Sequence, residues 1–308
     1  MNYIIGIDGG GTKTHCVLAA RDKSPVFECY GGPANFLMLG TETVSATLLE
    51  LVQQCLDAQK IGFHQIDAVL LGATGAGRRS DAETLERDFL SFIQQKNIRI
   101  RNFSVESDAR IALEGAFSGR EGCILIAGTG SILFGKDNKD RIYRVGGFGR
   151  FIGDEGSGYM LGKRGLMAAA KNFDGRGPDT LLLNLLSQEF KISSPEDLIT
   201  RIYRENFDIA SFAPLVIKAA EQGDHQALKI VEEEIDELIL HIKAIRKKII
   251  VATLHVSFIG GLIANDTFYS RTFREKITKT MADVRVIDAE NSPAYGAVLM
   301  AAKKLSGN

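Results

Sequence analysis

Two short glycine-rich turns, each set between two apolar segments, constrain the fold of this chain more than any other feature. The first turn is Gly9-Gly-Gly-Thr-Lys-Thr14, between apolar residues 4–7 and 16–20, and the second is Gly128-Thr-Gly-Ser131, between 122–127 and 132–135. An apolar run on each side of a tight turn predicts a β-hairpin. Because the same strand-turn-strand unit occurs twice, the sequence predicts two related domains.

Glycine turns of this kind suit phosphate binding, because backbone N–H groups can close around phosphate oxygens where no side chain intervenes. In the first turn, Thr12 and Lys13 add a hydroxyl and a positive charge. The spacing departs from two common nucleotide motifs, since Thr12 stands where a P-loop has its lysine and Thr14 where a dinucleotide fingerprint has its third glycine. A strand rather than a helix is predicted after the turn, which argues against the P-loop and Rossmann folds.

Strands and helices alternate in the rest of the first domain. Apolar periodicity predicts a strand at 26–30, a helix from Thr41, and then strand 66–72, helix 82–95, strand 103–105 and helix 109–116. This is the βββαβαβα order of an α/β domain with a mixed sheet. The later chain is predicted to be helical over 157–171 and over most of 180–241, to return to a strand at 254–259, and to end in a helix, 294–305, that packs on the first domain.

The composition is that of a globular chain with a small-molecule partner. The 308 residues are 45% hydrophobic and 24% charged, which suffices for two domains. Because 37 basic side chains face 38 acidic ones, no positive surplus is present to hold a nucleic acid or an anionic membrane. The chain opens without a signal-peptide pattern and contains no bilayer-spanning segment, so we expect a cytoplasmic protein.

The cysteines and histidines do not form a metal motif in the sequence. Cys16, Cys29, Cys55 and Cys123 are widely spaced, with no Cys-x-x-Cys pair. The five histidines show no ligand spacing either, and we expect them to be structural. The cysteines are therefore predicted to be reduced and mostly buried thiols.

Six motifs follow one another along the chain. They are Asp8-Gly-Gly-Gly-Thr-Lys-Thr14, Asp108-Ala109, Gly128-Thr-Gly-Ser131, Gly146-Gly-Phe-Gly149, Gly153-Asp-Glu-Gly-Ser-Gly158 and Gly260-Gly261. In this order the chain resembles, over nearly its whole length, the BadF-type and N-acetylglucosamine kinase branch of the actin-like ATPases. The resemblance implies a two-domain actin-like ATPase (ribonuclease H-like) α/β fold, with mixed sheets flanked by helices and an active-site cleft between the domains. We expect the first domain at 1–117 plus 289–308, and the second, with a helical insertion, at 118–288.

The resemblance also implies ATP and Mg²⁺ as cofactors. The implied phosphate loops and adenosine-side turn are Gly10, Gly11, Thr12 and Lys13; Gly128, Thr129, Gly130 and Ser131; and Gly260 and Gly261. Asp8 would help to hold hydrated magnesium. The amino sugar would be held by Asn35, Gly147, Phe148 and Asp154, together with Asp108.

Sugar phosphorylation needs a carboxylate that accepts the proton of the attacking hydroxyl, and Asp108 is our candidate for this catalytic base. It follows a predicted strand and opens a predicted helix. An aspartate at such a junction is also a good helix N-cap, a task that Ser107 can share. Asn35 has the alternative role of a turn residue, and Asp154 that of an acid favoured near a helix N-terminus.

The expected function is ATP-dependent phosphorylation of an amino sugar, N-acetylglucosamine or glucosamine, at the 6-hydroxyl. One alternative is an ATPase that activates a dehydratase or reductase system, which needs cysteines that bridge a cluster between subunits. The other alternative is a non-catalytic sugar sensor. The sequence leaves open whether the protein forms a homodimer.

Overall fold

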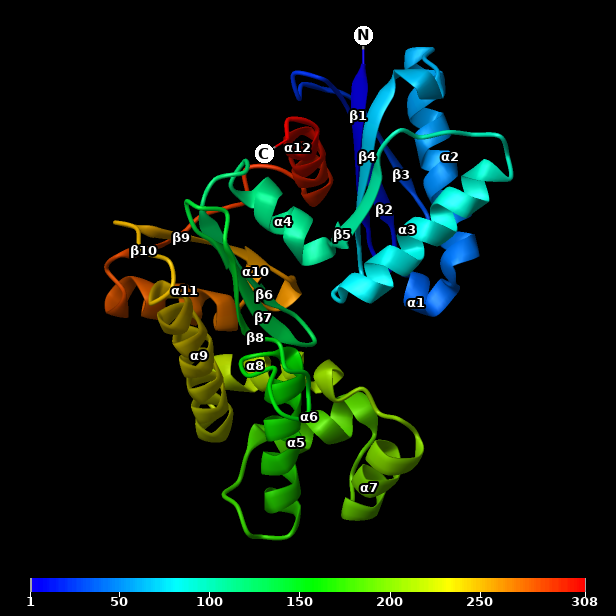
Figure 1. Cartoon of the computed structure of the whole chain (residues 1–308). Coiled ribbons are helices and arrows are strands. Elements are labelled where there is room, and N and C mark those ends of the chain that lie inside the picture. Colours follow the sequence, from blue (N-terminus) through cyan, green and yellow to red (C-terminus); the bar gives the residue numbers. More distant parts are fainter. Residues whose placement is uncertain (1, 308) are drawn as a thin grey trace. The chain divides into compact units, whose positions relative to one another are not determined.

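The computed structural model describes residues 2–307, which form two compact units. Unit 1 comprises the chain up to Glu121 and from Asp288 onward, and unit 2 comprises Gly122–Ile287. Each unit is built around one five-stranded sheet (Figure 1).

The sheet of unit 1 consists of β1 (Tyr3–Gly9), β2 (Thr14–Ala20), β3 (Pro25–Gly31), β4 (Ile66–Ala73) and β5 (Phe103–Ser107). Its strand order is β3-β2-β1-β4-β5. The pairs β1–β2 and β2–β3 are antiparallel, whereas β4 is parallel to both β1 and β5. The carboxyl ends of β1, β4 and β5 therefore meet at one edge of the sheet.

Helices cover both faces of this sheet, as the alternating side chains of β1 require (Figure 1). Ile5 and Ile7 pack with α2 (Thr41–Gln59) and α3 (Arg79–Gln94) on one face, and Ile4 packs with α4 (Asp108–Ala116) and α12 (Pro293–Leu305) on the other. Two short elements, α1 (Phe36–Leu39) and the 3₁₀ turn η1 (Phe63–Gln65), complete the unit. The last helix thus packs on the first unit, as predicted.

The sheet of unit 2 repeats this topology. It consists of β6 (Gly122–Ala127), β7 (Ser131–Lys136), β8 (Ile142–Gly146), β9 (Leu254–Ile259) and β10 (Val284–Val286), in the order β10-β9-β6-β7-β8. Again the first three strands are antiparallel neighbours, and the last two are parallel to the first. Two mixed sheets flanked by helices confirm the predicted fold class.

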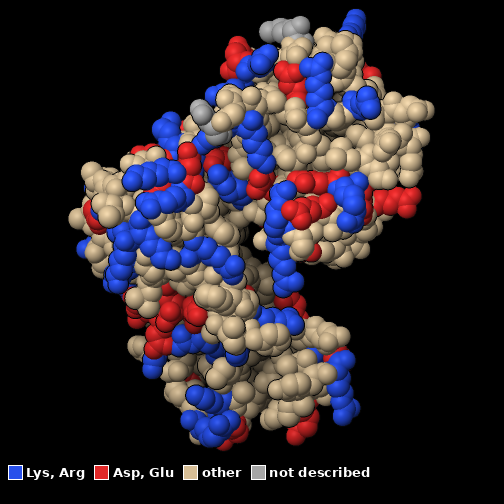
Figure 2. All heavy atoms as spheres, viewed as in Figure 1, with Lys and Arg blue, Asp and Glu red and all other residues tan. Residues whose placement is uncertain are grey.

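The helices of unit 2 share one apolar core with β6 and β9. They are α5 (Gly158–Phe173), α6 (Leu181–Phe190), α7 (Pro195–Arg204), η2 (Ile209–Phe212), α8 (Ala213–Glu221), α9 (His225–Arg246), α10 (Gly261–Ala264) and α11 (Phe268–Thr280). Among the residues described, no helix combines the length and apolar character needed to cross a membrane. On the face drawn in Figure 2, basic and acidic side chains are both spread over the surface.

Candidate active site

The first glycine turn joins β1 to β2 and is held in shape by backbone contacts. The amide of Gly10 donates to the carbonyl of Lys13 at 3.2 Å, and a Cβ at Gly10 would lie only 2.8 Å from that carbonyl oxygen. The space beside Gly11 is open, so its backbone can be approached closely. Thr12 and Lys13 are exposed at the tip, with the Lys13 ammonium 5.4 Å from the centre of the Tyr30 ring. A tight backbone turn with open amides and one cation suits a phosphate group.

Two carboxylates come together at the carboxyl edge of the unit 1 sheet. Asp8 lies near the end of β1, and Asp108 follows β5 directly. Burial and the negative charge of Asp108 raise the pKa of Asp8 above its ordinary value, although His15 and Lys13 oppose the shift. A divalent cation relieves the repulsion that a buried acid such as Asp8 experiences from a second acid. The geometry therefore fits hydrated Mg²⁺ held through Asp8.

The Asp108 side chain is fixed by a residue that the sequence did not point to. The hydroxyl of Thr74, directly after β4, donates to Asp108 Oδ2 at 2.9 Å, and the amide of Ala109 donates to Asp108 Oδ1 at 2.7 Å. The N-cap of α4 is Ser107, whose hydroxyl accepts from the amide of Arg110 at 3.2 Å. The half-buried carboxylate of Asp108 therefore satisfies one amide of the first helical turn and is also oriented by a donor outside the helix, Thr74.

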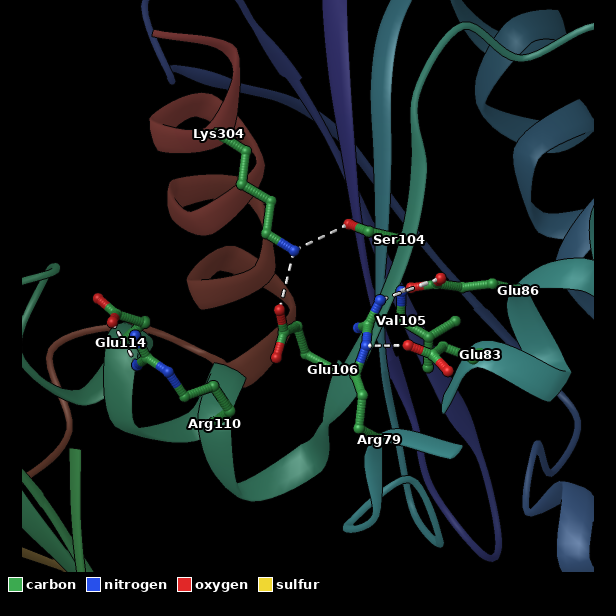
Figure 3. Close-up of polar contacts among 9 residues, drawn as sticks. All are labelled: Arg79, Glu83, Glu86, Ser104, Val105, Glu106, Arg110, Glu114 and Lys304. Carbon is green, nitrogen blue, oxygen red and sulfur yellow. Dashed lines mark hydrogen bonds and ion pairs between the residues drawn. The ribbon is translucent and has the colours of Figure 1, made fainter. Parts of the chain in front are cut away.

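Polar side chains hold the edge strand that leads to Asp108 (Figure 3). Glu86 of α3 accepts from the amide of Val105 at 2.7 Å, which satisfies a donor on the free edge of β5. From α12, the Lys304 ammonium contacts Ser104 at 3.3 Å and Glu106 at 2.8 Å. Figure 3 also shows Arg79 bonded to Glu83 and Glu86, and Arg110 bonded to Glu114. These contacts fix the strand end from two helices.

Asn35 lies in the loop after β3, and this loop is hydrogen-bonded to the first glycine turn. The amide of its neighbour Ala34 donates to the carbonyl of Gly10 at 2.9 Å. Asn35 itself caps α1, because its side chain accepts from the amide of Leu37 at 3.2 Å and its φ is −77°. Its side chain thus has a local task as well as a place beside the turn.

The second glycine turn joins β6 to β7 and is supported by Asp154. The amide of Ser131 donates to Asp154 Oδ1 at 3.3 Å, and a Cβ at Gly130 would lie 3.0 Å from Asp154 Oδ2. The amides of Gly158 and Tyr159, at the start of α5, donate to the carbonyls of Gly128 and Thr129. Asp154 has a left-handed φ of 60°. This loop is therefore ordered by contacts within the unit.

Buried polar residues anchor the centre of the same loop. Glu234 of α9 accepts from the amide of Gly156 at 2.6 Å and pairs with Arg164 at 2.9 Å. The hydroxyl of Tyr269, which is fully buried, donates to the Gly156 carbonyl at 2.9 Å. Glu234 and Tyr269 lie 78 and 113 positions from Gly156 in the sequence, so no local pattern could have revealed them.

The predicted sugar-binding residues Gly147 and Phe148 lie at the start of this loop. Gly147 has a φ of +72°, and a Cβ there would lie 2.3 Å from the Ile132 side chain, so the loop passes very close to β7. Phe148 is 67% exposed and packs against Gly153. The Phe148 ring therefore offers an apolar surface next to the polar loop.

Two cavities of unit 2 share Thr129. One, of about 320 Å³, is lined largely by apolar groups and by the turn at Gly261. Its lining residues include Gly128, Ala213, Pro214, Ile217 and Leu262. An apolar cavity that lies next to a glycine turn of the phosphate-binding kind suits a purine ring.

The other cavity, of about 570 Å³, contains Asp154 and Arg150. The Arg150 guanidinium lies 5.1 Å from the ring centre of Phe151 and 6.0 Å from that of Tyr159. Within residues 2–307, Arg150 forms no ion pair with an acid. A guanidinium that lies at aromatic rings and forms no ion pair can pair with a carboxylate of a polar ligand.

Taken together, the two units have one topology, and each has a glycine turn after its first strand. The chain belongs to the BadF/BadG/BcrA/BcrD ATPase family, whose model matches residues 5–301.

Curated relatives and a solved structure agree with this assignment. The N-acetylmuramic acid/N-acetylglucosamine kinase of Clostridium acetobutylicum is 36% identical, with 98% of each chain covered. The N-acetyl-D-glucosamine kinase of Dictyostelium discoideum is 27% identical over 96% of this chain and 97% of its own. A crystal structure from Chromobacterium violaceum superposes with a TM-score of 0.71 at 24% identity, covering 98% of this chain and 99% of the other. That structure shares the fold.

Proposed function

We propose that this protein is an ATP-dependent kinase that phosphorylates an amino sugar, N-acetylglucosamine or a close relative, at its 6-hydroxyl. The observation that carries the proposal is the Asp108 carboxylate. It stands half-buried at the carboxyl edge of the unit 1 sheet, beside Asp8, and is oriented by the Thr74 hydroxyl, while Ser107 is the N-cap of α4. The two kinase relatives named above support the substrate class.

In the proposed reaction, Asp108 accepts the proton of the sugar hydroxyl as that oxygen attacks the γ-phosphorus of ATP and ADP leaves. Thr74 and the amide of Ala109 would hold the carboxylate in a fixed orientation while it accepts this proton. In unit 1, the amides of the first glycine turn and the Lys13 ammonium would bind phosphate oxygens, and in unit 2 the amides of the second turn would do the same. Asp8 would hold hydrated Mg²⁺, which supplies positive charge to the phosphates when bound.

In unit 2, the apolar cavity beside Gly261 would take the adenine ring. The cavity that contains Asp154 would take the sugar, with Asp154 accepting hydrogen bonds from its hydroxyls. The exposed Phe148 ring would contact the acyl methyl group. Asn35 would bind a further sugar hydroxyl while it continues to cap α1.

The cysteines bear on the rival function of a dehydratase activator. All four are free and buried, so none stands at the surface to bridge a cluster between subunits. This observation favours the kinase.

The test is ADP formation with Mg-ATP across N-acetylglucosamine, glucosamine, N-acetylmannosamine, N-acetylmuramic acid, glucose and no sugar, for the natural protein and for Asp108→Asn. We expect turnover with an amino sugar and its almost complete loss in Asp108→Asn, with ATP binding retained. Sugar-independent ADP formation would point to the activator. Sugar binding without ADP formation would point to the sensor.

A further inference from the structure

Three of the four cysteines, far apart in the sequence, come together inside unit 1. Cys16 lies on β2, Cys29 lies opposite it on β3, and Cys55 lies on α2. Cys55 Sγ is 3.6 Å from Cys16 Sγ and 3.9 Å from Cys29 Sγ, and all three sulfurs lie within 4.8 Å of one another. The side chains of the kinase mechanism proposed above do not include them.

The spacing of the sulfurs suits a single ion at their centre. For an ion bonded to three sulfurs at about 2.3 Å, the length known for zinc–thiolate bonds, a planar arrangement places the sulfurs about 4.0 Å apart. The separations of 3.6 Å and 3.9 Å lie close to this value. Little movement of β2, β3 or α2 would therefore be needed for an ion to bind.

The set of donors restricts the metal. Within the described chain, the cluster of potential ligands contains sulfur alone, without a histidine or a carboxylate. Magnesium and calcium require oxygen ligands, and iron–sulfur clusters take four cysteines. Zinc at a structural site takes four ligands, whereas this cluster offers three. Cys16 and Cys55 are also fully buried, with 0% exposure. Three thiol groups in an apolar core are suited to a soft metal ion that is stable with a low coordination number.

We propose that Cys16, Cys29 and Cys55 form a binding site for one monovalent copper ion, Cu(I).

The charge of the cluster is compatible with such an ion. When Cu(I) binds, it replaces one thiol proton, which leaves to solvent. The single positive charge of the ion replaces that of the proton, so the total charge of the cluster does not change. Binding thus adds no net charge to the core, which would otherwise be costly.

The surroundings provide an entry route and a structural effect. Cys29 is 8% exposed and belongs to β3, an edge strand of the sheet, so the ion can enter from that edge. Bound Cu(I) would connect β2 and β3, the hairpin that follows the first glycine turn, to α2. Because a ligand that binds only the folded state stabilises it, copper-loaded protein should melt at a higher temperature.

The experiment offers the full-length protein Cu(I) as its coloured bicinchoninate complex, without oxygen and with a reductant. We expect the natural protein to withdraw one copper per chain from the chelator. Cys29→Ala and Cys55→Ala should each lose this stoichiometric binding. The matched control is Cys123→Ala, which removes a fully buried cysteine of unit 2 and should still bind one copper.

X-ray absorption at the copper edge then identifies the ligands in the natural protein, so the test does not depend on whether the variants fold. Sulfur neighbours alone are expected. Failure to withdraw copper would overturn the proposal and leave the three thiols as packing groups of the core. Nitrogen or oxygen ligands, or loss of binding in Cys123→Ala alone, would also overturn it.

Discussion

The hydrogen bond from Thr74 to Asp108 gives the sharpest test of how the candidate base is positioned. Thr74→Val keeps the shape of the side chain and removes the hydroxyl that lies 2.9 Å from Asp108 Oδ2. A hydrogen bond to a charged group contributes about 1.5–3 kcal/mol. If this energy is lost in the transition state alone, the rate falls about 10- to 150-fold. We therefore expect kcat for the amino sugar to fall within that range while KM for ATP changes little.

The assay is sugar-dependent ADP formation at saturating Mg-ATP, with Thr74→Ser as the matched control because it keeps the hydroxyl. The amide of Thr74 donates to the carbonyl of Gly9 in every variant, so the backbone stays tied to β1. A natural rate in Thr74→Val would refute the positioning role. Equal losses in the serine and valine variants would also refute it, because serine keeps the hydroxyl and the loss would then not be specific to the hydrogen bond.

Three further predictions concern charges and a sheet edge. Burial and the charge of Asp108 raise the pKa of Asp8 in the folded protein above its unfolded value of about 3.8. The free energy of unfolding therefore falls as the pH rises from the unfolded pKa to the folded pKa, and the loss is complete above the folded pKa. Asp8→Asn should therefore raise the melting temperature of the ligand-free protein at pH 7, and raise it by less near pH 4. The same variant should bind Mg-ATP more weakly. A lower melting temperature at pH 7 would contradict this prediction. Glu86→Ala leaves the amide of Val105 without its acceptor and should lower the free energy of unfolding by about 1–3 kcal/mol in urea, whereas Glu86→Gln keeps an acceptor; equal losses in both variants would argue against the hydrogen bond. Arg150→Ala should raise KM for N-acetylmuramic acid about tenfold or more and leave KM for N-acetylglucosamine nearly unchanged, because only the first sugar carries a carboxylate; equal changes would remove Arg150 from carboxylate recognition.

The sequence predicted the parts of the fold that are specified locally. Both hairpins were predictable, because each has an apolar run on both sides of a glycine turn, and the helices of unit 1 follow a clear apolar period. Two strands were not predicted. β8 is an edge strand with half-exposed side chains, and β10 has only three residues, which pair in parallel with β9. Neither strand has a long apolar run, so its existence depends on the partner strand.

The candidate site also contains residues that could be predicted from the sequence and residues that could not. Glycine turns and the Asp108 junction are visible in the sequence, since their spacing is short. Thr74 and Glu234 act on residues 34 and 78 positions away, and the three cysteines that meet in the core are 26 and 39 positions apart at their contacts. Such groups are brought together only by strand order and helix packing. A single sequence contains no local pattern that distinguishes them from other polar or small core residues.

The repeated topology explains how one arrangement of strands can carry two different tasks. By strand order β4 corresponds to β9, and β1 to β6, so the residue after β4 corresponds to the residue after β9. In unit 1 this residue is Thr74, whose amide bonds Gly9 at the end of β1 and whose hydroxyl orients Asp108. In unit 2 it is Gly260, with a φ of +96°, where a Cβ would lie 2.4 Å from the carbonyl of Ala127 at the end of β6. No side chain fits there, and the chain turns directly into Gly261, which lines the apolar cavity. The same junction therefore positions a candidate base in one unit and opens a candidate nucleotide pocket in the other.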